Sequence, residues 1–144
     1  DLSWRSMEEF LDNFSSRKFS CNLASMLGLG TIREVVVGLD DRPATPEELN
    51  RMREEVKKAL EDGAIGLSTG LEYTPGSFAS TEELIELCKA APEIKRIYST
   101  HMRNEDNKVL EAIDEAIIIH HPNNDVKKIS IRENKIKKKQ TKKK

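Results

Sequence analysis

Apolar residues recur every three to four positions in several segments of the chain, which is the pattern of helices with one buried face. The pattern is clearest over residues 45–63. Thr45 and Glu48 can form a capping box there, and Pro46 suits the first helical position. Gly63 is placed to end the helix. The residues of its apolar stripe are Leu49, Met52, Val56, Ala59 and Leu60.

Three other segments begin with a Ser or Thr that is followed three positions later by a Glu, which is a helix start signal. These pairs are Ser6–Glu9, Thr31–Glu34 and Ser80–Glu83. They predict helices over residues 6–14, 31–37 and 80–91. Gly38 is placed to end the second of them. Asn104 is expected to cap a fifth helix, whose inward residues would be Val109, Leu110, Ile113, Ala116 and Ile117.

Short runs of apolar and small residues between these helices predict strands. The runs cover residues 19–24, 64–69, 94–101 and 126–131. Strand–loop–helix units repeated in this order are typical of a parallel α/β fold, in which ligands bind at the loops after the strands. The loops expected to carry chemistry are therefore 22–30, 68–78 and 100–105, together with whatever follows Ser130.

The composition, 37% hydrophobic and 34% charged, is that of a soluble protein, but the charge is unevenly distributed. Residues 132–144 hold eight Lys or Arg and one Glu, whereas residues 1–131 hold 16 basic and 24 acidic residues. The basic segment has no apolar periodicity, so we expect a lysine-rich disordered tail. No apolar run approaches the roughly 18 residues of a membrane span, and no signal peptide is expected. A cytoplasmic protein with no membrane partner is expected.

The two cysteines, Cys21 and Cys88, form no CxxC pair, so neither a disulfide scaffold nor a thiolate zinc site is indicated. Each lies in an apolar run and is expected to be a buried thiol. His101 is a stronger candidate for chemistry because it ends a predicted strand and precedes a polar cluster at a helix start. A neutral imidazole at that place could bind a metal, or it could be a hydrogen-bonded structural residue.

Three segments, in order and at similar spacing, resemble N-acyl-D-amino-acid deacylases of the amidohydrolase superfamily. They are residues 38–49 (GLDDRPATPEEL), 66–79 (GLSTGLEYTPGSFA) and 98–105 (YSTHMRNE). The resemblance runs from about Trp4 to Ile117. It implies an amidohydrolase TIM barrel that uses zinc to hydrolyse N-acyl-D-amino acids. The chain is thus expected to be an α/β fragment, with about four βα units of that barrel over residues 1–131, because a whole barrel has eight.

The resemblance also implies roles for single residues. His101 matches a metal-ligating histidine at a barrel strand end, and Tyr73 matches a tyrosine that faces the substrate. Ser68 and Arg103 are further candidates for substrate binding. A turn-capping hydroxyl is the structural alternative for Ser68, and an ion pair is the alternative for Arg103. No catalytic acid or base is assigned.

A departure from the family occurs after residue 117. An alignment without gaps places Ile131 where the family carries a second histidine ligand, and isoleucine cannot bind a metal. We therefore expect the isolated chain to be inactive, although its family is that of metal-dependent hydrolases of linear amides. The alternatives are a fragment related to cyclic-amide hydrolases such as dihydroorotase or hydantoinase, and a non-catalytic module with a basic nucleic-acid-binding tail. Nucleic acid is not the expected partner, because no aromatic residues interleave with the lysines. The oligomeric state is not predicted.

Overall fold

A computed structural model describes residues 4–92 and 97–121 and contains a three-stranded parallel sheet in the order β1-β2-β3. All strands therefore run in the same direction, as the predicted α/β class requires. The elements are α1 (Met7–Ser15), β1 (Leu27–Gly28), α2 (Leu29–Val36), α3 (Pro46–Glu61), β2 (Leu67–Gly70), the short 3-10 helix η1 (Gly76–Phe78), α4 (Thr81–Ala90), β3 (Tyr98–His101) and α5 (Val109–His120).

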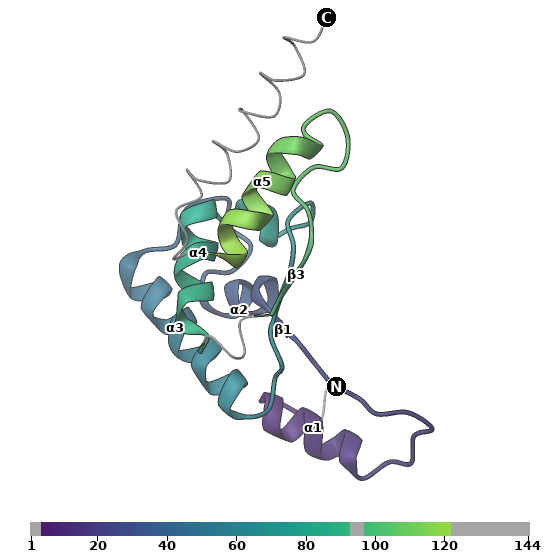
Figure 1. The fold of residues 1–144 in the computed structure, drawn as a ribbon. Coiled ribbons are helices and arrows are strands. Elements are labelled where there is room, and N and C mark those ends of the chain that lie inside the picture. The colour runs from purple at the N-terminus through teal and green to yellow at the C-terminus, as the bar shows by residue number, and fades with distance from the viewer. Residues whose placement is uncertain (1–3, 93–96, 122–144) are drawn as a thin grey trace, which may run out of the picture.

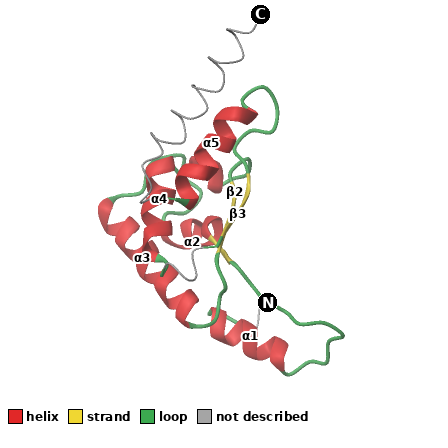
Figure 2. Cartoon of the chain, viewed as in Figure 1, coloured by secondary structure: helices red, strands yellow, loops and turns green. Residues whose placement is uncertain are grey.

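Helices α2 to α5 lie on one side of the sheet, and α1 lies below it, next to the end of α3 (Figure 1). Figure 2 shows the same layers, with the strands at the edge of the helical layer. The buried core lies between the sheet and these helices. Its most deeply buried apolar side chains include Met52, Val56, Leu60, Leu67, Leu84 and Leu87.

The capping signals locate two helices well. The Thr45 side chain accepts a hydrogen bond from the Glu48 amide, and the Glu48 carboxylate accepts one from the Thr45 amide. Ser80 caps α4 in the first of these ways, through the Glu83 amide. Gly63 has a φ of +122°, a left-handed conformation that favours glycine and follows the end of α3. Both predicted helices are confirmed, as is the buried face predicted for α3.

The predicted strand over residues 19–24 is wrong. That segment forms an exposed loop, and the first strand is Leu27–Gly28. Backbone pairing with the segment that leads into β2 starts at Ser25, whose carbonyl accepts a hydrogen bond from the Ile65 amide. The alternation of residues 19–24 therefore has no neighbouring strand to pair with. As a consequence Cys21 is exposed, which corrects the expectation of a buried thiol, whereas Cys88 is buried as expected.

The predicted inward face of the last helix is wrong in part, because Val109, Ala116 and Ile117 are half-buried but the other two residues are exposed. Leu110 is 64% exposed and Ile113 39% exposed, whereas Ala112 and Ile119 are buried. Helix α5 is apolar on most sides, so its own sequence does not single out one stripe. Its packing against α4 selects the buried side. Asn104 accepts backbone hydrogen bonds in the turn before α5 and does not serve as its N-cap.

The bounds of three elements differ by a few residues from prediction. The strand predicted over residues 64–69 is β2, which starts at Leu67. Helix α2 starts at Leu29, two positions before the predicted Thr31, and Gly38 follows it with a φ of +87°. Strand β3 covers only the last part of the predicted run 94–101. The predicted strand 126–131 and the tail 132–144 lie outside the described residues. Within the described part, no helix is long and apolar enough to cross a membrane.

Candidate functional site

Side chains alternate between the two faces of the parallel strands, and this alternation separates packing from chemistry. Leu67 pairs with Tyr98 in register, and both contact the core beneath the helices. Ser68 and Ser99 are the next pair and point to the opposite face. Two positions after Ser99, His101 ends β3 on that same opposite face. The sequence therefore presents His101 at the carboxyl end of the sheet, away from the helices.

His101 lies among polar groups from both neighbouring loops. Its Nε2 is 3.3 Å from the hydroxyl of Tyr73, and the two rings meet edge to face with their centroids 5.0 Å apart. Its Nδ1 lies 3.4 Å from Glu105 Oε1 and 3.7 Å from Glu72 Oε2. Neither carboxylate contact is a hydrogen bond, so Nδ1 has no hydrogen-bond partner among the described residues. The imidazole as a whole is 39% exposed, whereas its Nδ1 atom is buried.

Tyr73 is carried by the loop between β2 and η1, which folds back on the strand end. The Tyr73 amide donates to Gly70 O, and the Ser77 amide donates to Tyr73 O. Gly76 lies so close to Gly70 that a Cβ atom there would be 2.6 Å from the Gly70 carbonyl oxygen. Glycine is therefore required at position 76 for the loop to close. The closed loop places the tyrosine ring beside His101.

Ser68 and Arg103, the other two candidates for substrate binding, do not contact His101 and have different partners. The Ser68 hydroxyl donates to Leu27 O at 3.3 Å, so it links β2 to β1 while remaining partly accessible on the open face. Arg103 is bound to Glu115 and to the carbonyls of Ser77 and Ala79. The structure thus brings Tyr73 and His101 into contact, places Ser68 on the same face, and holds Arg103 in an ion pair.

A network of hydroxyl groups lies beneath the site, on the face covered by helices. Thr69 Oγ1 is 2.7 Å from both Tyr98 OH and Thr100 Oγ1. The Thr100 hydroxyl also donates to the carbonyl of His101. Burial raises the pKa of Tyr98 above its ordinary value, because the phenolate would lose hydration. Tyr98 therefore stays protonated and joins β2 to β3 immediately below His101.

The residues of the site meet only part of the requirement for zinc. A histidine can ligate the ion through a ring nitrogen, and protein zinc sites use three or four side-chain ligands. In His101 the Nδ1 atom is buried beside the carboxylates of Glu72 and Glu105. Across residues 4–92 and 97–121, no group of three or more His, Cys, Asp or Glu side chains could hold a metal ion. The described residues therefore fit one ligand position and do not form a zinc site by themselves.

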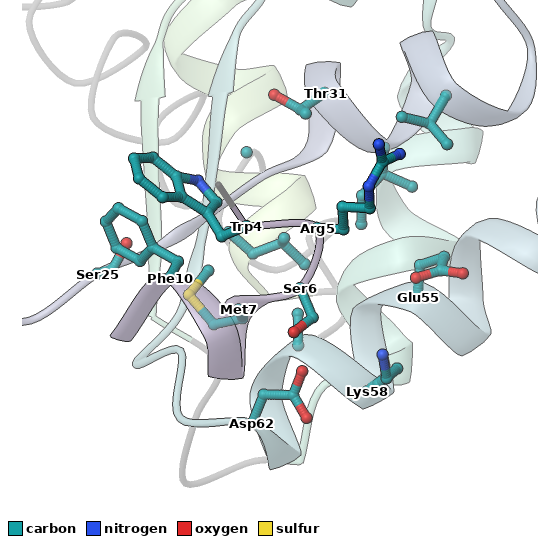
Figure 3. Close-up of a pocket in the computed structure, with 15 residues that line it drawn as sticks. Trp4, Arg5, Ser6, Met7, Phe10, Ser25, Thr31, Glu55, Lys58 and Asp62 are labelled. Carbon is teal, nitrogen blue, oxygen red and sulfur yellow. The ribbon is translucent and has the colours of Figure 1, made fainter. Parts of the chain in front are cut away.

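A cavity of about 520 Å³ lies elsewhere, between α1, α2 and α3 (Figure 3). Trp4, Met7 and Phe10 form one wall, and Asp62 from the end of α3 lies on another. Asp62 comes shortly before β2, so the cavity is at the end of the sheet where the strands begin. None of the predicted site residues lines it.

Comparison with known proteins gives the same family as the motifs. The chain is 39% identical over 111 residues to D-aminoacylase from Alcaligenes xylosoxydans xylosoxydans, a match that covers 77% of this chain and 23% of the relative. The chain is a relative of the N-acyl-D-amino-acid deacylases. It spans about a quarter of the length of the deacylases that it matches. No protein-family model matches it.

Solved deacylase structures agree with the fold described above. A crystal structure of D-aminoacylase matches with a TM-score of 0.74 and 36% identity, over 79% of this chain and 24% of that protein. An N-acyl-D-glutamate deacylase from Bordetella bronchiseptica, solved with zinc and a phosphonate inhibitor, matches with a TM-score of 0.75 and 30% identity. That match covers 81% of this chain and 25% of the enzyme. The α/β fold therefore corresponds to one quarter of a deacylase.

Sequence reasoning missed two buried or half-buried carboxylates. The sequence indicates Glu83 only as part of a helix cap, yet it forms a buried ion pair with Arg33 at 2.7 Å. Glu115 was not singled out, although it accepts hydrogen bonds from Arg103 and Thr81. Each carboxylate is far in sequence from one of its partners. A charged residue on an otherwise apolar helix face was the available signal in both cases.

Proposed function

We propose that this chain supplies part of the active site of a zinc-dependent N-acyl-D-amino-acid deacylase. The observation that carries the proposal is the contact between His101 and Tyr73 at the carboxyl end of the sheet. Ligand sites of parallel α/β barrels gather at this end. The kinship to deacylases over most of the described residues supports the same reading.

In this proposal each of three residues has one task. His101 provides one metal ligand, and Tyr73 presents its hydroxyl to the substrate beside that metal. Ser68 lines the same face with a second hydroxyl. Zinc bound at such a site would polarise the amide carbonyl and activate a water molecule. The substrate class, an N-acyl-D-amino acid, is inferred from the names of the relatives.

The chain of 144 residues is expected to be inactive alone. It contains three histidines, and the described residues offer a single position suited to zinc. Purified chain incubated with zinc and N-acetyl-D-amino acids should therefore release no free amino acid. Zinc-dependent release above a blank without protein would contradict this expectation.

A chimera tests the positive part of the proposal. Residues 4–121 would replace the matching quarter of the Alcaligenes D-aminoacylase, which would supply the remaining ligands. The chimera should hydrolyse an N-acetyl-D-amino acid, and His101→Ala should abolish hydrolysis and reduce the bound zinc. His121→Ala is the matched control, because His121 is exposed at the end of α5, and it should keep activity. Full activity and zinc content in the His101→Ala chimera would refute the assignment.

A further inference from the structure

Arg103 has almost no hydrogen-bonding capacity left for a substrate. Its Nε and Nη2 donate to the Glu115 carboxylate at 2.9–3.1 Å. Its Nη1 donates to Ser77 O, and Nη2 also donates to Ala79 O, each at 2.9 Å. A guanidinium has five N–H donors, and these contacts use all but one on Nη1. A substrate carboxylate could not be bound by the usual two-pronged geometry, which needs two free donors on one edge.

The same contacts connect Arg103 to Tyr73. Ser77, whose carbonyl accepts from Arg103, donates its own amide to the Tyr73 carbonyl at 2.8 Å. The Tyr73 amide in turn donates to Gly70 O at the end of β2. The backbone on both sides of Tyr73 is thus fixed, at one end by the strand and at the other by the guanidinium.

Glu115 anchors the guanidinium to the helices. Its side chain is 12% exposed and accepts from the Thr81 hydroxyl at 2.7 Å as well as from Arg103. Thr81 is the first residue of α4, and Glu115 belongs to α5. A carboxylate with this many charge-assisted and neutral donors is held in one orientation. The loop that carries Tyr73 is therefore tied to the loop after His101 and to two helices.

We propose that Arg103 and Glu115 are positioning residues that hold Tyr73 against His101, and that Arg103 does not contact the substrate. The importance of this contact for catalysis rests on the proposed function. The clamp, by which we mean the hydrogen bonds of Arg103 with Glu115, Ser77 and Ala79, rests on the contacts described above. Without the clamp, the loop keeps the hydrogen bond from the Tyr73 amide to Gly70 O. It loses the guanidinium that donates to the carbonyls of Ser77 and Ala79. The exposed ring of Tyr73 would then leave the edge-to-face contact with the imidazole.

Fluorine NMR can measure this contact because the chain has only two tyrosines, Tyr73 and Tyr98. The full chain would be labelled with 3-fluorotyrosine, and the two resonances assigned with Tyr73→Phe and Tyr98→Phe. The Tyr73 resonance in His101→Ala defines its position without the imidazole. In Arg103→Gln the Tyr73 resonance should move toward that reference position. The Tyr98 resonance, from a residue packed between β2 and the helices, should stay in place.

Two further variants keep the test decisive. Arg103→Lys retains the charge but cannot span Ser77, Ala79 and Glu115 together, so it should also move the Tyr73 resonance. Glu115→Gln keeps the volume and one acceptor oxygen, and it replaces Arg103→Gln if that variant shows no folded circular dichroism spectrum. Arg42→Gln is the matched control, since it breaks a comparable two-pronged pair with Glu48 in another loop. It should move neither resonance.

The outcomes are distinct. An unmoved Tyr73 resonance in a folded Arg103 or Glu115 variant would overturn the proposal, as would equal movement of both tyrosine resonances, which indicates general loosening. The measurement needs neither zinc nor substrate. A failure of the clamp would therefore leave the deacylase proposal standing, and an inactive chimera would leave the clamp standing.

Discussion

The helix-covered face of the sheet and its open face carry different kinds of side chains. Leu67 on the covered face is fully buried, and Tyr98 beside it is half-buried under the helices. On the open face Ser99 is exposed and His101 is accessible. The first face contributes most of the buried apolar area, which is the main source of stability. The second contributes little burial and the reactive groups.

This contrast teaches that stability and chemistry are separable in this chain, residue by residue along one strand. A change on the covered side should lower the free energy of unfolding and leave the His101 contacts in place. A change on the open side should leave the free energy of unfolding almost unchanged and should alter the contacts of His101.

The largest loss of stability is expected at the buried ion pair between α2 and α4. Arg33 and Glu83 are 1% and 6% exposed, and one Nη of Arg33 is 2.7 Å from both carboxylate oxygens. Arg33→Leu leaves a buried carboxylate without its partner and should lower the free energy of unfolding by about 3–5 kcal/mol. Urea denaturation at pH 7 measures the change.

The double variant Arg33→Met, Glu83→Leu is the informative control for that pair. Apolar residues of similar volume remove both charges together, so most of the lost stability should return. A double variant as unstable as Arg33→Leu would show that the pair stabilises the fold through its geometry, including the hydrogen bond from Arg33 to Arg42 O.

A smaller difference is expected between the two faces of adjacent strands. Leu67→Ala removes a side chain that is 0% exposed and should cost about 2–4 kcal/mol, because it leaves a cavity against the helices. Ser99→Ala, its matched control on the open face of β3, should change stability by less than about 0.5 kcal/mol. Comparable losses for both variants, measured by urea denaturation, would contradict the division between the faces.

The sequence predicted the helices well where a cap and an apolar stripe agreed. Helix α3 has a reciprocal capping box, and α4 has a Ser cap, so local bonds fix where each begins. The stripe then fixes which side is buried. The motif around His101 was also informative, because strand alternation and the end of β3 both follow from local sequence.

Features set by distant partners could not be predicted in the same way. Residues 19–24 alternate like a strand, but a strand exists only where a neighbour pairs with it, and pairing starts at Ser25. Helix α5 has apolar residues on several sides, so only its contact with α4 reveals the buried one. The clamp of Arg103 and Glu115 joins two loops and two helices, and the sequence indicated an ion pair for Arg103 without naming its partner.

The smallest effect is expected at the surface pair of Arg42 and Glu48, and it depends on pH. The hydrogen bonds from Arg42, with a further one from the Thr45 amide, lower the pKa of Glu48 from 4.5 to about 2. A carboxyl whose pKa is lower in the folded state stabilises the fold above its unfolded pKa, and this contribution disappears as protonation proceeds.

Arg42→Gln should therefore be less stable than the original chain at pH 6, and the stabilities of the two chains should converge as the pH falls from about 4.5 to about 2. Urea midpoints at pH 6 and pH 3 measure the convergence. Arg51→Gln, an exposed change on the same helix, should show no such trend, and a constant gap for Arg42→Gln would refute the assignment.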